Sequence, residues 1–457
     1  MHRFRRTGVV SLNCLVALLF VLGAGVARGF ETGYWAWQRN EPPSAVEVQE
    51  LVAQGVRAIY WQIGELAENA GTWRWTQRFT LPANTSEMRY LPVVRLESRE
   101  RRPFSTEANA SLRAALSQVI GDSSELQIDY DAPDRLLADY AAMLKQLHQI
   151  VPRVTITALP HWAHTTAVRD LRGAADEFLV MLYDFEPDRS GAPPIPLIVP
   201  EKMDRYLAEW NKTQLPWRAG LPVFARVSVF DGEGRSRGHV REWNWDDICF
   251  NSALEVVAPT SLGVTTLRAK GDTRVENAAV RLGQAVVTRL ADRDALLRAV
   301  SAARAGSAHG VVIFRFPDST DPSGLSLRQL GHLEATPQLS VRVNSEASVL
   351  ELTNHSDADL TFSAEAGERG YALQIEALAA IFRDGTSGDF YRLAGDAEGR
   401  AVTVPLATRL TFWFSHLRAH ETLRTGAIRL APAANFSQAR WHIHNFAPQS
   451  QWQPLQP

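Results

Sequence analysis

Cysteine is nearly absent from this chain. Its 457 residues contain two, Cys14 and Cys249, so neither a disulfide framework nor a zinc site rich in thiolates is available. Cys14 lies in an N-terminal apolar run that we expect to be removed, which leaves Cys249 alone. The stability of the mature chain must therefore come from its hydrophobic cores.

The signatures of nucleotide, metal and serine hydrolase sites are also missing. No GxGxxG or GxxxxGK[ST] turn occurs, and residues 38–43, after the first strand-like run, read Gln-Arg-Asn-Glu-Pro-Pro. The pairs His161/His164 and His442/His444 have no HExxH or cysteine partner motif, and no serine lies in a GxSxG turn. We therefore expect no nucleotide, no metal and no other cofactor.

An excess of positive charge is lacking as well. The chain has 48 basic and 50 acidic residues, and removal of the N-terminal segment with its four arginines leaves 44 against 50, a formal charge near −6. Binding to nucleic acid requires a cationic face that neutralises phosphates. Nucleic acid is therefore disfavoured as a partner.

The N-terminus has the pattern of an export signal. Arg3, Arg5 and Arg6 precede an apolar run at 12–26, and Ala27-Arg28-Gly29 places small residues where a signal peptidase reads them. We expect residues 1–29 to be a signal peptide cleaved before Phe30, which predicts a periplasmic or extracellular protein of a bacterium. The alternative is an uncleaved anchor, since the run approaches spanning length; only this leader would contact a membrane.

Strand-like and helix-like segments alternate over residues 30–335. Eight strands with intervening helices favour a closed (β/α)8 barrel of the TIM type, an α/β fold, over an open sheet. The expected helices span 44–54, 106–120, 133–150, 200–213 and 278–305, and a stretch near 231–275 is too long for an ordinary connection, so we interpret it as an insertion. The expected strands are 33–37, 56–63, 90–96, 126–131, 154–159, 177–183, 222–230 and 310–316.

The pattern of expected secondary structure changes at about Thr336. Short alternating segments replace the helices, and turn residues such as those at 354–357 separate them. Residues 336–457 are therefore predicted to form a smaller all-β sandwich domain. The expected strands are 339–343, 349–352, 360–363, 373–377, 401–404, 410–414 and 427–430.

Acidic and aromatic residues gather where the barrel strands end, which is where barrel enzymes build their sites. Aromatic rings stack on the apolar faces of sugars, and carboxylates bond their hydroxyls. The pattern indicates a carbohydrate site, although tryptophans that fill the core and acids that pair with buried arginines would give a similar inventory. The candidate binding residues are Trp35, Trp37, Trp61, Arg95, Glu97, Gln127, Trp162, Asp184, Glu186 and Arg226.

Residues 126–133 carry the strongest signal. They read Leu-Gln-Ile-Asp-Tyr-Asp-Ala-Pro, so Gln127, Asp129 and Asp131 share one face of the expected fourth strand. Two carboxylates on one face repel each other, which raises the proton affinity of one and suits it to act as a general acid. A surface edge strand would show the same alternation.

This segment resembles the fourth-strand signature of family 18 glycoside hydrolases, Asp-x-Asp-x-Glu. Met181-Leu182-Tyr183-Asp184 is similar to the Met-x-Tyr-Asp that closes that family's sixth strand. The whole chain resembles a bacterial family of exported proteins that carry a domain of unknown function. The resemblance implies a chitinase-like barrel with Asp131 as general acid, Asp129 orienting the substrate's acetamido group, and Tyr183 donating a hydrogen bond to the ring intermediate.

Two positions depart from that signature. Asp131 stands where the family has Glu, one methylene longer, and Gln127 stands where it has the outer Asp. Gln127 can hydrogen-bond Asp129 but cannot share a proton with it. With a sugar lacking the acetamido group, Asp131 would need a second carboxylate from the candidates Asp184, Glu186 or Glu97.

The sequence thus predicts an exported glycoside hydrolase-like protein that hydrolyses or binds a polysaccharide containing amino sugars. The short acid leaves a second hypothesis open, a catalytically silent carbohydrate-binding protein. A third is a structural envelope protein that uses the barrel as a scaffold.

Overall fold

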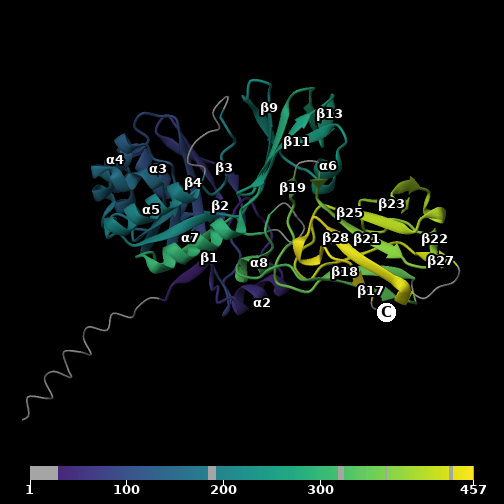
Figure 1. Cartoon of the computed structure of the whole chain (residues 1–457). Coiled ribbons are helices and arrows are strands. Elements are labelled where there is room, and N and C mark those ends of the chain that lie inside the picture. The colour runs from purple at the N-terminus through teal and green to yellow at the C-terminus, as the bar shows by residue number, and fades with distance from the viewer. Residues whose placement is uncertain are drawn as a thin grey trace, which may run out of the picture.

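The computed structural model describes residues 29–183, 192–317, 324–346, 348–365, 368–431 and 436–455. The expected leader therefore lies, except for Gly29, outside the described residues. Within them, no helix is long and apolar enough to cross a membrane. The chain forms a barrel with an outer layer of helices, and two regions of antiparallel sheet lie beside it (Figure 1).

Eight parallel strands close into a barrel. Each strand pairs with its neighbours in the order β1, β2, β4, β5, β6, β7, β8, β16, and β1 pairs with both β2 and β16, so the sheet has no free edge there. The prediction of a (β/α)8 barrel is confirmed. The strands are β1 (Glu31–Ala36), β2 (Ala58–Asn69), β4 (Arg89–Ser98), β5 (Glu125–Asp129), β6 (Arg153–Ala158), β7 (Glu177–Met181), β8 (Trp217–Pro222) and β16 (Gly310–Phe314).

Helices cover the outside of the barrel, and their caps explain where several begin. Ser44 accepts a hydrogen bond from the backbone N–H of Glu47, and the Glu47 side chain accepts one from Ser44 N–H, a capping box that starts the first helix. Two 3-10 helices, η2 (Pro160–His164) and η3 (Thr166–Leu171), follow β6 in place of a regular helix. The helices are α2 (Ala45–Ala53), α3 (Thr106–Ser117), α4 (Leu137–Leu147), α5 (Pro200–Thr213), α7 (Arg293–Ala305) and α8 (Leu327–Gly331).

Each barrel strand divides its side chains between two cores. On β5, Leu126 and Ile128 pack into the layer between strands and helices. Gln127 and Asp129 alternate with them and so face the barrel axis. The apolar part of the interior is a small cluster of Trp35, Tyr60, Leu91, Val93, Leu179 and Val312.

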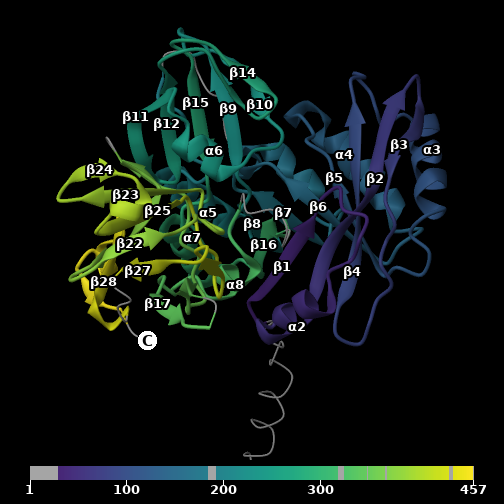
Figure 2. The same ribbon diagram turned by 90° about the vertical axis from the view of Figure 1, so that its right-hand side faces the viewer.

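A lobe of antiparallel strands is inserted between β8 and α7 (Figure 2). Its five-stranded sheet has the order β10, β9, β15, β12, β11, and its core includes Phe362 and Ala364 from beyond the barrel, so the lobe packs against the C-terminal region. Its elements are β9 (Arg226–Phe230), β10 (Ser236–Val240), α6 (Trp245–Phe250), β11 (Leu254–Ser261), β12 (Val264–Ala269), β13 (Thr273–Val275), β14 (Ala278–Val280) and β15 (Ala285–Arg289).

Two sequence predictions fail in this lobe. The expected helix at 278–305 is two strands, a turn and then α7, because Gly283 has φ +81° and the β-branched run at 286–288 pairs with β9 and β12. The expected strand at 222–230 is two strands in different sheets, because β8 ends at Pro222 and β9 belongs to the lobe. The helix begins only where Asp292 caps it by accepting from Ala295 N–H.

From Leu339 onward the described residues form strands and short 3-10 helices without an α-helix, as expected of an all-β region; the 3-10 helices are η4 (Val404–Leu406), η5 (Phe436–Gln438) and η6 (Ala447–Gln449). A six-stranded sheet and a three-stranded sheet enclose a core that includes Leu352, Leu373 and Phe412. Residues 360–363, an expected strand, form only the single bridge of Leu360 with Leu417. The strands are β17 (Leu339–Asn344), β18 (Val349–Asn354), β19 (Ala364–Glu365), β20 (Glu368–Arg369), β21 (Tyr371–Ala377), β22 (Ile381–Asp384), β23 (Arg392–Ala397), β24 (Arg400–Val402), β25 (Arg409–Phe414), β26 (Thr422–Arg424), β27 (Arg429–Ala431), β28 (Ala439–His444) and β29 (Gln453–Pro454).

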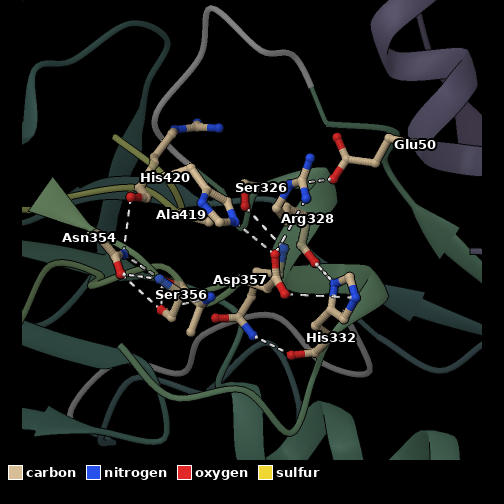
Figure 3. Close-up of polar contacts among 12 residues, drawn as sticks. Glu50, Ser326, Arg328, His332, Asn354, Ser356, Asp357, Ala419 and His420 are labelled. Carbon is tan, nitrogen blue, oxygen red and sulfur yellow. Dashed lines mark hydrogen bonds and ion pairs between the residues drawn. The ribbon is translucent and has the colours of Figure 1, made fainter. Parts of the chain in front are cut away.

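Polar contacts fasten this region to the last helix of the barrel. Arg328 on α8 bridges Glu50 of α2, at 3.1 Å, and Asp357, at 3.4 Å (Figure 3). Ser326 caps α8 by accepting from Gln329 N–H at 3.1 Å. Buried Asp359 holds this capping residue by accepting from the Ser326 N–H at 2.6 Å and the Ser326 hydroxyl at 2.8 Å. The β region is thereby held against the barrel by hydrogen bonds to a charged group.

Candidate functional site

An open cavity of about 490 Å3 lies at the carboxyl ends of the barrel strands. A larger cavity, about 600 Å3, lies on the outside of the barrel against α5, but no Trp, Tyr or Phe lines it and it holds no pair of carboxylates. The barrel cavity combines acids, one guanidinium and several rings. Its lining residues are Trp35, Trp37, Arg95, Asp129, Asp131, Leu159, Pro160, His161, Met181, Tyr183, Tyr206 and Phe314.

Asp129 is the buried acid of this cleft, with a side chain only 2% exposed. Its Oδ1 accepts from the Thr157 hydroxyl at 2.9 Å, and its Oδ2 accepts from Arg95 Nη1 at 3.2 Å. Burial raises the pKa of Asp129 to about 6, against the opposing effect of Arg95. This carboxyl therefore titrates close to neutral pH.

Asp131 is the accessible acid. It follows the end of β5, its side chain is 49% exposed, and its Oδ2 lies 3.9 Å from Arg95 Nη2. Partial burial raises the pKa of Asp131 and Arg95 opposes the rise. A carboxyl that reaches the cleft and whose proton affinity is increased has two of the properties of a general acid.

Arg95 connects the acids. It is the register partner of Asp129 on the adjoining strand β4, so both side chains stand on the same face of the sheet. Its Nε donates to Glu97 Oε1 at 3.2 Å, and its Cζ lies 5.7 Å from the centroid of the Trp37 ring. The guanidinium thus forms hydrogen bonds with Asp129 and Glu97, a longer ion pair with Asp131, and a contact with the Trp37 ring.

Aromatic rings form the walls of the cleft. Trp35 and Trp37 meet edge to face with centroids 5.5 Å apart, and Tyr183 stacks on Phe314 at 5.3 Å with an angle of 8° between the rings. The cleft therefore presents flat apolar surfaces beside hydrogen-bonding groups, the combination that sugars require.

Two predicted tryptophans do not lie in the cleft. Trp61 on β2 is fully buried between strands and helices, packs on Tyr90 and donates from Nε1 to the Thr80 carbonyl at 3.0 Å. Trp162, in η2, is also fully buried in that outer core. Both expectations are corrected: Trp61 stands on the outward face of its strand, and Trp162 lies in a helix that follows β6.

Gln127, Glu97 and Arg226 also lie away from the cleft's lining. Gln127 is buried beneath it, and among the described residues its Oε1 has no hydrogen-bond partner. The side-chain donors to Asp129 in this part of the chain are Arg95 and Thr157, so the bond from Gln127 that the sequence allowed is not formed. Glu97 is 59% exposed at the rim. Arg226 begins β9 of the lobe, where its guanidinium lies 5.4 Å from the Phe224 centroid. The remaining candidates, Asp184 and Glu186, fall outside the described residues.

Thr157 was missed by sequence reasoning, as were the cleft residues Met181, Tyr206 and Phe314. A signal for Thr157 existed, because Thr155 and Thr157 alternate with apolar residues along β6 and so put hydroxyls on the barrel axis. Thr157 also accepts from Tyr130 N–H at 3.2 Å, which fixes its hydroxyl toward Asp129. In the described parts of the chain, no three His, Cys, Asp or Glu side chains are arranged to hold a metal ion.

Comparisons with known proteins give one family and a set of distant structures. Residues 89–244 match the sequence family described as Domain of unknown function (DUF3142). A search of curated proteins gives no match.

Among solved structures, the C-terminal domain of a candidate chitinase from Desulfitobacterium hafniense is similar over 67% of this chain and 98% of that one, with 13% identity and a TM-score of 0.48. A chitinase from Chromobacterium violaceum is similar over 63% and 94%, with 13% identity and a TM-score of 0.44. The spore cortex-lytic enzyme SleL from Bacillus cereus is similar over 67% and 74%, with 13% identity and a TM-score of 0.44.

Proposed function

We propose that this chain is an exported glycoside hydrolase that cleaves a polysaccharide containing amino sugars, with Asp131 as the general acid. One observation carries the proposal: the end of one barrel strand places a buried acid, Asp129, and an accessible acid, Asp131, in the same aromatic cleft. The export pattern of residues 1–29 supports the proposal, because an exported protein would meet such polymers.

The proposed reaction uses the different environments of the accessible Asp131 and the buried Asp129. Asp131 would give its proton to the glycosidic oxygen as the bond to the sugar's anomeric carbon breaks, while the acetamido oxygen of the same sugar bonds to that carbon. Asp129 would stabilise the positive charge that develops on the acetamido group, and the Tyr183 hydroxyl would donate to its oxygen. The protonated oxygen leaves with the rest of the polymer as an alcohol. Water then attacks the anomeric carbon as the bond from that carbon to the acetamido oxygen breaks, which restores the acetamido group, and the water gives a proton to Asp131, which restores the acid.

A second candidate function is carbohydrate binding without hydrolysis. It is favoured by the identity of residue 131, since an acid retracted by about 1 Å can lose on the order of a hundredfold in rate. The ion pair with Arg95 also favours the ionised form of Asp131, which cannot act as an acid. Binding of glycans with no product from any of them would support this candidate over the first.

Both candidates require the aromatic walls. Trp37→Ala removes a ring from the cleft and should weaken binding of N-acetylglucosamine oligosaccharides roughly five- to tenfold, because one aromatic stack contributes about 1 kcal/mol. Isothermal titration calorimetry with the hexasaccharide measures this. The matched control is Tyr391→Ala, which removes a 41% exposed ring from the C-terminal β region; equal affinities of the two variants would contradict a glycan site in the barrel cleft.

A further inference from the structure

We propose that Arg95 is a positioning residue that holds Asp129 and Asp131 in one arrangement and takes the place of the outer acid missing from the strand motif. This inference rests on the proposed function, because it assigns how the acids of that site are held. The sequence predicted that Arg95 contacts the substrate. The structure leads us to a different role, in which Arg95 positions the two acids.

Each nitrogen of the Arg95 guanidinium faces a carboxylate. Nη1 bonds Asp129 at 3.2 Å, Nη2 lies 3.9 Å from Asp131, and Nε donates to Glu97 at 3.2 Å. Stacking on Trp37 fixes the plane of the fork. An arginine with one carboxylate at each nitrogen acts as a clamp, since its planar donors set the direction of each partner.

Asp129 depends on this clamp because its other neighbours offer little. Gln127 stands where an outer acid would bond it, but no hydrogen bond joins the two side chains among the described residues. Thr157 is then the one remaining side-chain donor. A carboxylate that is 2% exposed and bonded by a single hydroxyl is costly to ionise. Without Arg95, Asp129 would therefore keep its proton at neutral pH.

The other titratable groups around the clamp do not substitute for it. Glu65 is the register partner of Arg95 on β2, but its Oε1 accepts from Gln62 Nε2 at 3.3 Å. Glu97 adds negative charge at the rim. His161 lies in the same cleft and pairs with Asp134 at 3.1 Å. Among the described residues, Arg95 is the one cation within bonding distance of Asp129.

The test measures protonation directly, so it does not need an active enzyme. In the full chain with carboxyl-13C aspartate, Asp129→Asn and Asp131→Asn assign the two signals, and their titration is followed in wild type and in Arg95→Gln. We expect the Asp129 midpoint, near pH 6 in wild type, to rise by at least one pH unit in Arg95→Gln. An unchanged midpoint overturns the proposal.

Two further variants make the result specific. Arg95→Lys keeps the positive charge but lacks the planar guanidinium, so the midpoint of Asp129 titration in this variant should fall between those of wild type and Arg95→Gln. If Arg95→Gln does not fold, Arg95→Lys takes its place in the test. Arg89→Gln removes an exposed arginine from the opposite end of the same strand and should leave the midpoint in place. A shift in Arg89→Gln as large as that in Arg95→Gln would contradict a local clamp.

Activity supplies an independent readout. If wild type hydrolyses a glycan, the acidic limb of its kcat/KM profile should move to higher pH in Arg95→Gln by about the shift seen in the titration. A lower rate with an unmoved limb contradicts the clamp. If wild type hydrolyses nothing, the proposed function fails, while the titration still decides the role of Arg95.

Discussion

Asp131→Asn is expected to lower hydrolysis of an N-acetylglucosamine polymer by about a thousandfold while the protein remains folded. Asparagine has the shape of the acid but no proton to give, and a general acid contributes on the order of 10²–10⁴ in rate. Asp131 is half exposed and its bond to Arg95 is long, so its loss should change the thermal midpoint little. Reducing ends released per minute measure the rate, and circular dichroism checks the fold.

The control for this variant is Asp139→Asn. Asp139 is an exposed aspartate on α4, so the substitution has the same chemistry away from the cleft. It should retain the wild-type rate. Asp131→Asn with more than a tenth of wild-type activity would remove Asp131 from the role of acid.

Asp129→Asn is expected to lose activity and gain stability. The loss should be about a hundredfold, the cost of removing one stabilising group from a developing charge. The gain follows because the buried carboxylate is unfavourable when ionised. Loss of function together with increased stability distinguishes a site acid from a structural one.

The pH dependence of that gain has a definite sign. Burial raises the pKa of Asp129 from 3.8 to about 6 in the folded state, so between these values the folded chain binds more protons than the unfolded chain and loses stability as pH rises. A shift of about two units corresponds to about 3 kcal/mol as an upper limit. Asp129→Asn should therefore exceed wild type in free energy of unfolding at pH 8 and match it near pH 4.

Urea denaturation at the two pH values checks this prediction. Asp139→Asn again serves as control and should follow wild type at both. If Asp129→Asn is less stable than wild type at pH 8, the carboxylate contributes more through Arg95 and Thr157 than its burial costs, and Asp129 belongs to the structural framework of the barrel.

The sequence predicted the barrel because strand-like apolar segments alternate with helix-like segments over residues 30–335. Asp129 and Asp131 could be placed in the cleft because β5 alternates cleanly, with Leu126 and Ile128 on the opposite face. The alternation of polar and apolar residues predicted both the strand and which of its faces is polar. Arg95 followed from its position near the end of β4.

Trp61 could not be placed because β2 gives no alternation. Residues 59–64 are all buried, on both faces of the sheet, so the pattern does not tell which side chains point to the axis. The register of β2 against β4 also shifts between Gln62 and Gly64, where φ is +153° and a Cβ would lie 2.3 Å from the Gln77 carbonyl. The structure turns Gln62, and not Trp61, away from the outer core.

The inserted lobe could not be predicted for a different reason. The alanine and valine content of residues 285–289 is compatible with a helix or a strand. These residues form a strand because they pair with β9 and β12. The sequence raised pairing of the acids with buried arginines only as an alternative, because the side-chain directions that bring Arg95 to Asp129, Asp131 and Glu97 cannot be deduced from it.

The most direct test of the central claim is hydrolysis of matched substrates by the purified chain. N-acetylglucosamine hexasaccharide and its fully de-N-acetylated counterpart are incubated with wild type and with Asp131→Asn, and the products are followed by mass spectrometry. We expect cleavage of the N-acetylated sugar by wild type alone, since that sugar supplies the acetamido oxygen and Asp131 the proton. Equal cleavage of both sugars, or equal cleavage by both proteins, would contradict it.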